Sequence, residues 1–588
     1  MRTIIFIISL FITSALVFTL NRSIPSSGES IPPLGKFLNP FTGFWQNKTD
    51  DKLISETLSM TNLKEAVKIV YDDRLVPHIF AENELDLHYA QGYTTAKHRL
   101  FQIDLVTRLA SGRLSEILGS ELLEFDKLNR RRGIAWAAQN AVIAWRQSDQ
   151  YPKLEAYVKG VNDYINSLSP KDYPLELKLL GYEPEQWTDY KTALFIKNMA
   201  DVLASREEDI EATNALDVLG QDAFDFIYPE YNPKTSPVIP ADKKWTFKNS
   251  KESPDQPTDK NLSSHPKRIT PKMPKGIGSN NWAVSGKKTA SGYPILCNDP
   301  HLNLTLPSTW FEVQLHCPEF NVYGVSLPGI PGVIIGFNND ISWGVTNVGH
   351  DVADYYRINW AEANKESYFL DGKIKPADIV IEKIKVKDQE TVLDTVKYTV
   401  WGPVVFESSD QQDLALRWLG HTSSTPNELS TFNQLAKAKN YDDYYKALQH
   451  YTCPAQNMVF ASREGDIAMR VQGRFPIKKK EQGRFVQDGD QTANAWSGYI
   501  PYEQIPAIKN PTRAFVSSAN QHSTAPDYPY YYNGEFEQFR GRILNRILGK
   551  MDNINPDDMK ALQNSSFSIK AEEALPLLLD LINTDDLD

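Results

Sequence analysis

The spacing of apolar residues divides the chain into a helical part and a strand-rich part. From Asn83 to about Gly119, and less regularly to about residue 230, apolar positions recur at the spacing of a helix face. After Ser279 the period falls to two, which predicts strands joined by turns. The expected segments are 67–73 and 76–81 as early strands; 281–285, 294–297, 313–315, 322–325, 333–335, 341–345, 379–384, 392–400, 414–418 and 458–461 as later strands; and 429–448, 540–551 and 577–582 as helices.

A polar, proline-rich segment, residues 231–278, separates the two parts. Its prolines lie among Lys, Asp and Ser, a composition that buries too little apolar surface to pack well. A long segment of this kind inside a compact protein is usually functional or disposable. We therefore predict that residues 231–278 are a linker between a mostly helical region, 65–230, and a strand-rich region, 279–588.

The N-terminus has the composition of a targeting segment. Arg2 precedes an apolar stretch from Ile4 to about Leu20, which is a little short for a comfortable membrane span and has no clean A-x-A cleavage site after it. Residues 1–22 are therefore interpreted as a signal peptide or an uncleaved membrane anchor, and residues 23–64 as a tether. Both interpretations export the rest of the chain, to the periplasm or to its membrane face.

Composition and the absence of several motifs exclude some classes of function. The 588 residues are 41% hydrophobic and carry a net charge of −11, so there is no basic excess to neutralise nucleic-acid phosphates. The short basic run 478–480 is interpreted as a solvated loop. Three cysteines, with no CxxC pair, give no disulfide framework. The sequence also lacks the G-x-S-x-G elbow, HExxH, the Walker A motif and a strand–GxGxxG–helix unit.

The junction of the linker and the first later strand suggests another chemistry. If the bond between Gly278 and Ser279 is cut, Ser279 becomes an N-terminal residue whose hydroxyl is a nucleophile and whose own α-amine is the base. A free α-amine has a pKa near ~8, so much of it is unprotonated at mildly alkaline pH. The alternative is a surface turn before a strand, which is the usual setting of a Gly-Ser pair.

Several motifs in order along the chain carry a family resemblance. In the helical part they are Val76-Pro77-His78-Ile79, Ala90-Gln91-Gly92-Tyr93, Arg99-Leu100-Phe101-Gln102 and Gly112-Arg113-Leu114-Ser115-Glu116. After the linker they are Ser279-Asn280-Asn281-Trp282, Asn298-Asp299-Pro300-His301-Leu302, Pro331-Gly332 and Ser342-Trp343-Gly344-Val345-Thr346-Asn347. Together, from about residue 65 to 550, they resemble the penicillin acylase (penicillin amidase) family of N-terminal-nucleophile hydrolases.

The resemblance implies a fold and a maturation pathway. The fold would be α+β, a four-layer αββα sandwich with a largely helical α-chain region. The precursor would cut itself before Ser279, lose the linker, and leave an α chain and a β chain. Ser279 would then attack the carbonyl of an N-acyl amide, form an acyl-enzyme and release an amine. Because Gly278 has no Cβ, the bond before Ser279 can be held in a strained conformation.

The resemblance also assigns the groups around the nucleophile. The oxyanion donors would be the backbone N–H of Asn347 and the side chain of Asn520, which could otherwise be a turn asparagine. His301 occupies the position whose backbone touches the nucleophile's amine, and its side chain could tune or orient that amine or simply be packed. Arg540 matches a family arginine near the site, with Arg542 as a competing alignment.

A calcium site is implied as well. Asp351, Ala353 and Asp354 follow Asn347 at the spacing of the family's calcium loop, and two carboxylates with a backbone carbonyl suit a hard cation. Asp209 is the best match for a further ligand, with Glu211 as the fallback. An acidic helix face is the alternative for these last two. No organic cofactor is expected.

The family's acyl pocket maps onto four positions, namely Met199, Leu203, Leu302 and Ile335. Three of them, aromatic in relatives that accept phenylacetyl groups, are branched aliphatics here, while Met199 is retained in kind. The pocket stays apolar but changes shape, so we expect an aliphatic or fatty-acyl preference.

The region after Ser279 is shorter than family β chains usually are, so the C-terminal part of the pattern is expected to be truncated. The expected function is a self-processing amidohydrolase acting on small-molecule N-acyl amides. The alternatives are an acyl-homoserine lactone acylase and, from another class, a non-catalytic exported or membrane-tethered binding protein or inactive fragment.

Overall fold

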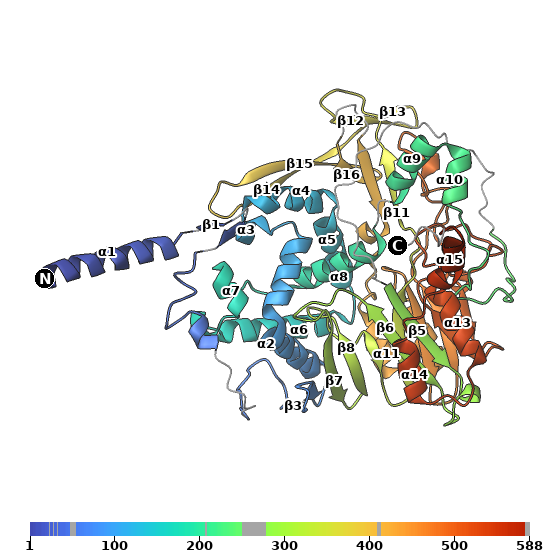
Figure 1. Ribbon diagram of the computed structural model, residues 1–588, viewed down its shortest axis with the longest axis horizontal. Helices are drawn as coiled ribbons and strands as arrows, with labels where there is room; N and C mark the ends of the chain where they lie inside the picture. The colour runs from blue at the N-terminus through green and yellow to red at the C-terminus, as the bar shows by residue number, and fades with distance from the viewer. Residues whose placement is uncertain are drawn as a thin grey trace.

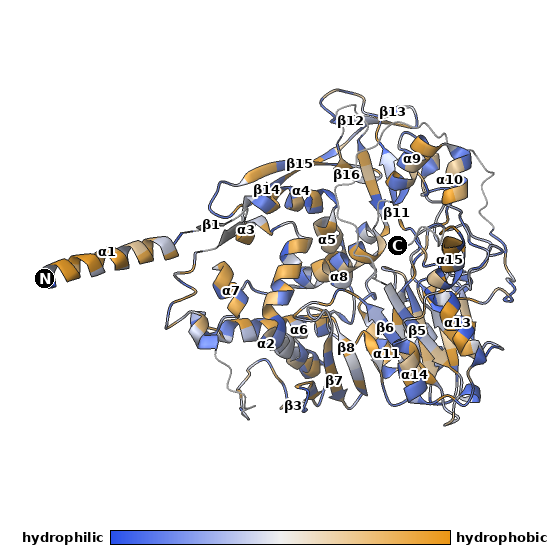
Figure 2. Ribbon diagram, in the orientation of Figure 1, coloured by the Kyte–Doolittle hydropathy of each residue, from blue (hydrophilic) through white to orange (hydrophobic). Residues whose placement is uncertain are grey.

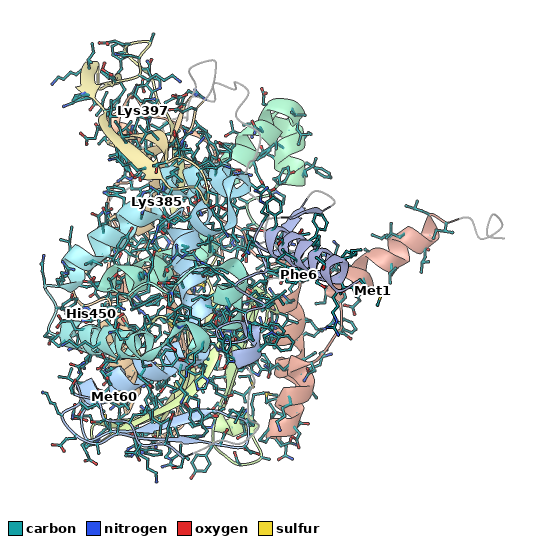
Figure 3. All side chains as sticks on the ribbon, turned by 90° about the vertical axis from the view of Figure 1, so that its left-hand side faces the viewer. Met1, Phe6, Met60, Lys385, Lys397 and His450 are labelled. Atoms are coloured by element: carbon teal, nitrogen blue, oxygen red, sulfur yellow. The ribbon has the colours of Figure 1, made fainter. Side chains whose placement is uncertain are left out.

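A computed structural model describes residues 1–22, 24–26, 29–31, 33–47, 55–205, 208–249, 278–407 and 413–582. Helix α1 (Arg2–Leu20) extends away from the rest of the chain (Figure 1) and is apolar along nearly its whole length (Figure 2). None of its residues is buried, and Phe6, labelled in Figure 3, is 66% exposed. Among the described residues it is the one helix long and apolar enough to cross a membrane, a test that signal sequences also pass.

The first part of the chain is helical, as predicted. Two short strands, β3 (Lys68–Tyr71) and β4 (Pro77–Phe80), come before it. The helices are α2 (Glu84–Ala110), α3 (Ser115–Leu118), α4 (Leu123–Arg131), α5 (Ile134–Trp145), α6 (Tyr151–Ser167), α7 (Leu175–Leu180), α8 (Asp189–Ala204), α9 (Glu208–Leu219) and α10 (Gln221–Ile227).

Two glycines allow the close packing of the long helices α2 and α6. A Cβ on Gly92 would overlap the carbonyl of Tyr157, and a Cβ on Gly160 would overlap the carbonyl of Tyr89. Each backbone thus lies directly on the other, which only glycine permits. The buried residues of this contact include Ala96, and α2 also contacts β4 and β7 of a sheet.

The largest sheet has nine strands, in the order β21-β19-β18-β10-β9-β8-β7-β4-β3. Its main core joins alternate residues of these strands to the inner faces of α2, α11 (Ser430–Lys437) and α12 (Tyr441–Leu448). Beyond β3 and β4 the strands are β7 (Phe311–Cys317), β8 (Phe320–Ser326), β9 (Ile335–Phe337), β10 (Ile341–Asn347), β18 (Gln456–Ser462), β19 (Ile467–Gln472) and β21 (Ala507–Lys509).

A three-stranded sheet, in the order β22-β5-β6, carries the linker junction. Strand β5 (Gly278–Val284) lies between β6 (Ile295–His301) and β22 (Phe515–Ser518), antiparallel to both. This sheet packs against β10 and β18 of the larger sheet. The helices that pack against it are α13 (Arg540–Lys550) and α14 (Pro556–Gln563), and α15 (Ile569–Asp580) lies against α13.

A six-stranded sheet, in the order β14-β15-β16-β17-β11-β20, lies beyond the helical part. Its hairpin β14–β15 extends over α4, where Arg130 pairs with Glu382 and Arg131 pairs with Asp394; Lys397 in Figure 3 marks the hairpin. The strands are β11 (Ala353–Arg357), β14 (Asp378–Ile384), β15 (Val392–Thr399), β16 (Gly402–Phe406), β17 (Leu414–Trp418) and β20 (Gln487–Asp488). Two further hairpins are β1 (Ile24–Ser26) with β2 (Glu29–Ile31), and β12 (Ser367–Leu370) with β13 (Lys373–Pro376).

The first part of the predicted linker is packed, contrary to its composition. Val238 and Ile239 are buried in a core with β18, β19 and β22, and their N–H groups donate to the carbonyls of His522 and Ser523 at 2.9 Å. Trp245 packs on Tyr528. Residues 231–249 therefore belong to the folded body, because a few apolar side chains among the prolines are enough to anchor them. Residues 250–277 of the predicted linker lie outside the described residues.

Other departures from the apolar pattern are local. The helix expected over 429–448 is two helices, α11 (Ser430–Lys437) and α12 (Tyr441–Leu448), because Asn440 caps the second with its side chain on the N–H of Asp443. Strands β11, β16, β19 and β22 are nearly all buried on both faces, so they lack the alternation that marks a half-exposed strand. The mixture of helices and sheets is α+β, as expected.

Candidate active site

Ser279 lies at the start of β5, buried between two neighbouring strands. Its register partner in β6 is Pro300, and Gly278 is opposite His301. The hydroxyl of Ser279 donates to the carbonyl oxygen of Gly278 at 2.6 Å. In the uncut chain the serine hydroxyl therefore lies next to the peptide bond that precedes it.

Asn520 and Arg540 converge on this serine. The backbone N–H of Ser279 donates to Asn520 Oδ1 at 2.6 Å. Arg540 donates from Nη1 to the carbonyl of Ser279 at 2.9 Å and to Asn280 Oδ1 at 2.6 Å, and from Nη2 to Asn520 Oδ1 at 2.9 Å. Burial lowers the pKa of the Arg540 guanidinium. Arg542, the competing candidate, points away and pairs with Glu573 of α15.

Asn520 also reaches the predicted oxyanion residue. It follows β22 with a left-handed φ of 65°, a conformation that asparagine tolerates better than most residues. Its Nδ2 donates to the carbonyl oxygen of Asn347 at 2.8 Å. Asn347 ends β10, and its side chain donates to the carbonyl of Leu203 at 3.0 Å. The structure thus brings Ser279, Asn347 and Asn520 together from three strands or their ends.

Two asparagines that sequence reasoning did not assign hold these strands in place. Asn298 of β6 donates to the carbonyls of Asn280 and Val345, both at 3.0 Å, and accepts from the N–H of Val345 at 2.7 Å. Asn457 of β18 donates to Ser518 Oγ at 3.0 Å. Asn298 lies in the Asn298-Asp299-Pro300-His301 motif, whereas no sequence signal indicated Asn457.

His301 lies across from Gly278, but its ring is turned to a carboxylate. Its Nε2 is 2.7 Å from Asp299 Oδ2, and Asn280 Nδ2 donates to the same oxygen at 3.2 Å. Burial raises the pKa of Asp299, but the hydrogen bond and charge of His301 outweigh it, and the net shift is downward. In the uncut chain the His301 side chain therefore orients the Asp299–Asn280 pair beside the nucleophile.

Comparison with known proteins identifies the family. The family model described as Penicillin amidase matches residues 66–588, which is most of the chain. The chain belongs to the penicillin amidase family.

The relatives of this chain carry different names. An acyl-homoserine lactone acylase QuiP from Pseudomonas aeruginosa is 29% identical over 503 residues, covering 82% of this chain and 58% of the relative. The penicillin acylase 2 proenzyme from Pseudomonas sp. (strain SE83) is 28% identical over 482 residues, covering 81% and 61%. The penicillin G acylase from Escherichia coli is 25% identical over 513 residues, covering 79% and 60%. The chain thus spans about three fifths of the length of these relatives.

Among solved structures, the thermostable penicillin G acylase from Alcaligenes faecalis in its orthorhombic form gives a TM-score of 0.47 at 22% identity. The match covers 52% of this chain and 57% of that one.

The residues assigned to a penicillin amidase acyl pocket are partly assembled. Met199 of α8 and Ile335 of β9 pack against one apolar cluster with Phe195, Leu327 and other buried residues. Leu203 lies one helical turn after Met199, and its carbonyl holds Asn347. Leu302 follows His301 directly, half-buried, and no described contact joins it to the cluster.

The residues assigned to the calcium site of a penicillin amidase meet a lysine. Lys478 Nζ donates to Asp351 Oδ2 and to Asp354 Oδ1, both at 2.7 Å. The side chains of Lys478, Asp351 and Asp354 are 2%, 8% and 0% exposed. Lys478 therefore does not lie in a solvated loop, as its basic run suggested. Its partners are 127 and 124 positions away, too far for any local pattern to indicate.

The remaining carboxylate oxygens also have donors from the protein. Asp351 Oδ1 accepts from the N–H of Ala353 at 3.0 Å, and Asp354 Oδ2 accepts from Trp496 Nε1 at 2.6 Å. Asp209 Oδ2 accepts from the N–H of Tyr355 at 2.6 Å. Burial, with Asp351 and Asp354 nearby, raises the pKa of Asp209 well above its usual range.

This arrangement does not fit a calcium ion. Ca²⁺ needs six to eight oxygens at about 2.3–2.6 Å, whereas here an ammonium lies between the two central carboxylates. Within the described part of the chain, no group of three or more His, Cys, Asp or Glu side chains is arranged to hold a metal. The predicted ligands Asp209, Asp351, Ala353 and Asp354 are close in the fold, but the carboxylate oxygens of the three aspartates accept hydrogen bonds from protein donors.

Proposed function

We propose that this chain is an exported, self-cleaving hydrolase of N-acyl amides whose nucleophile is Ser279. The observation that carries the proposal is the convergence of Asn520 and Arg540 on the backbone of Ser279, in a chain of the penicillin amidase family. A serine in an ordinary surface turn has no need of a half-buried arginine and a left-handed asparagine around its backbone.

The first step is cleavage of the bond before Ser279. The hydroxyl oxygen attacks the carbonyl carbon of Gly278, to whose oxygen it is already hydrogen-bonded at 2.6 Å. The peptide bond is exchanged for an ester on the serine, and the former amide nitrogen becomes a free amine. Water then hydrolyses the ester, which leaves Gly278 as a carboxylate and Ser279 as a new N-terminus.

The second step uses that amine as the base. The α-amine accepts the hydroxyl proton as the oxygen attacks the acyl carbon of the substrate, and it later passes the proton to the leaving amine. Asn520 Oδ1, which accepts from this nitrogen in the uncut chain, orients it. The Asn520 amide has a second N–H beyond the one donated to Asn347, and with the Asn347 backbone N–H it would stabilise the oxyanion. Water then releases the acid.

The acyl group we propose is aliphatic. The carbonyl of Leu203 holds the side chain of Asn347, and Met199, one helical turn earlier, packs with Ile335 against one apolar cluster. All three have flexible or branched side chains rather than flat rings. An acyl-homoserine lactone acylase is the second candidate, because this pocket suits an alkyl chain and several similar relatives carry that name. Initial rates with a medium-chain acyl-homoserine lactone and with another amide of the same acyl chain separate these two candidates. Faster hydrolysis of a phenylacetyl amide than of either substrate excludes the alkyl preference.

We further propose that the two facing sheets are the middle of a four-layer αββα sandwich. The contacts of α11 and α12 with the nine-stranded sheet, and of α13 and α14 with the three-stranded sheet, support this layering. The exposed apolar helix α1 supports export to the periplasm through a signal sequence or an anchor.

The test is the mass of the purified full-length protein and of its Ser279→Ala variant. We expect the wild type to yield a chain that begins at Ser279 and to hydrolyse acyl amides, and the variant to stay intact and inactive. A Ser279→Cys variant separates the steps, since a thiol can support cleavage and still fail in turnover. An intact wild-type chain with no hydrolysis would instead support an exported binding protein.

A further inference from the structure

The Lys478 ammonium lies where carboxylates from three segments meet. Asp351 precedes β11, Asp354 lies within it, and Asp209 of α9 is held to the same strand through the N–H of Tyr355. A charged group with so little exposure is retained only when its partners offset the cost of leaving water. Here the ammonium has two carboxylates at 2.7 Å.

The loop that carries Lys478 is shaped around this pair. Gly483, in the same loop, has a left-handed φ of 76°. A Cβ at that position would overlap Asp354 Oδ1 and Lys478 Nζ and would approach Asp351 Oδ2 to 2.8 Å. The backbone at Gly483 thus closes over the ion cluster and leaves no room for further ligands on that side. Asn533 completes the surroundings, donating to Asp351 Oδ2 at 3.2 Å.

We propose that Lys478 is a built-in cation that replaces the calcium ion at this position, so that the protein folds and keeps its structure without a divalent metal. A divalent ion and an ammonium cannot share the two carboxylate oxygens, because both need the same space and their charges repel. The tethered ammonium cannot be removed by a chelator or diluted away.

The cluster joins segments that follow the active-site strand β10 in the chain. The N–H of Asp351 donates to the carbonyl of Asn533 at 2.9 Å, and the cluster begins four residues after Asn347. It therefore holds β11 and the turn after β10 against the 478–483 loop and α9. Lys478 is a positioning residue, since it touches none of the groups around Ser279 that the structure describes.

The test is thermal unfolding of the full-length protein in calcium and in a chelator, so it does not depend on the proposed hydrolysis. We expect the wild-type Tm to be the same in both, and no calcium to remain bound after dialysis, as measured by elemental analysis. Lys478→Met should lower Tm by roughly 2–4 °C, because it leaves buried carboxylates without their cation.

The matched control is Lys480→Met, an exposed lysine of the same loop, which should leave Tm unchanged in either condition. The proposal is overturned if the chelator lowers the wild-type Tm, if the wild type retains one equivalent of calcium, or if Lys478→Met unfolds like the wild type. Should Lys478→Met fail to fold, the two wild-type measurements decide alone. A wild-type protein that hydrolyses no acyl amide but has the same Tm in calcium and in chelator would count against the proposed function and not against this inference.

Discussion

The side-chain oxygen of Asn520 accepts a hydrogen bond from the backbone N–H of Ser279 at 2.6 Å, although the two residues are 241 positions apart. The pairing of β22 with β5 sets this contact, because Ser518 is in register with Asn281 and the left-handed Asn520 turns back toward the start of β5. Cleavage before Ser279 would convert that N–H into the amine that serves as base. One side chain would then orient the base and donate to the oxyanion.

Asn520→Ala is expected to lower kcat by about 10²–10³-fold, the usual effect of losing one oxyanion donor. Steady-state hydrolysis of an acyl amide measures kcat, and gel electrophoresis measures precursor cleavage separately. Asn510→Ala is the control, since Asn510 also has a positive φ, but its side chain hydrogen-bonds the N–H of Ile467 and the side chain of Asp466 instead of groups around Ser279. An Asn520→Ala variant with the kcat of the Asn510→Ala variant would contradict the oxyanion role.

Arg540→Met is expected to slow precursor cleavage and to lower kcat by about 10²-fold. The guanidinium holds the carbonyl of Ser279 and the side chains of Asn280 and Asn520, so its loss loosens three groups at once. Arg542→Met, two residues away on the same helix, removes a partly exposed pair with Glu573 and should change neither rate. Equal effects of the two substitutions would mean that Arg540 acts only through the stability of α13.

The mature α chain is expected to extend past residue 249. Val238 and Ile239 are buried against β-region strands, so removal of residues 231–249 would expose that core. Mass spectrometry of the α chain should therefore place the upstream cut within 250–277. Ile239→Ala should lower the free energy of unfolding by about 2–5 kcal/mol. Lys244→Ala, an exposed residue of the same segment, should change it little. An α chain that ends near residue 231 would contradict this prediction.

The sequence predicted those parts of the molecule that depend on local spacing or on an ordered motif. The helical part, most strands after Ser279 and the positions of Asn520 and Arg540 belong to this class. Lys478 does not belong to it. A basic run has the same sequence whether its lysine is solvated or pairs with carboxylates more than a hundred residues away. The sequence did not predict the packing of Val238 and Ile239 for a related reason: two apolar residues among prolines form no periodic pattern.

Acid is expected to destabilise the fold between about pH 6.5 and pH 4, partly through His421. The ring is buried between Trp136 and Trp418, and its Nε2 donates to the carbonyl of Arg132 at 2.8 Å. Burial lowers the pKa of His421 to about 4 from a usual value of 6.5. The unfolded chain therefore takes up a proton in this window while the folded chain does not, so stability falls as the pH drops.

Denaturant unfolding of the uncleaved Ser279→Ala precursor at pH 7.5 and pH 4 measures this effect on a single chain. Adding His421→Gln keeps a donor for Arg132 but removes the titrating ring. We expect the double variant to be less stable at pH 7.5, because a packed ring is lost, yet to lose about 3 kcal/mol less on acidification. An identical acid loss in both proteins would show that His421 is protonated as readily in the folded state as in the unfolded one, and that its burial carries no pH dependence.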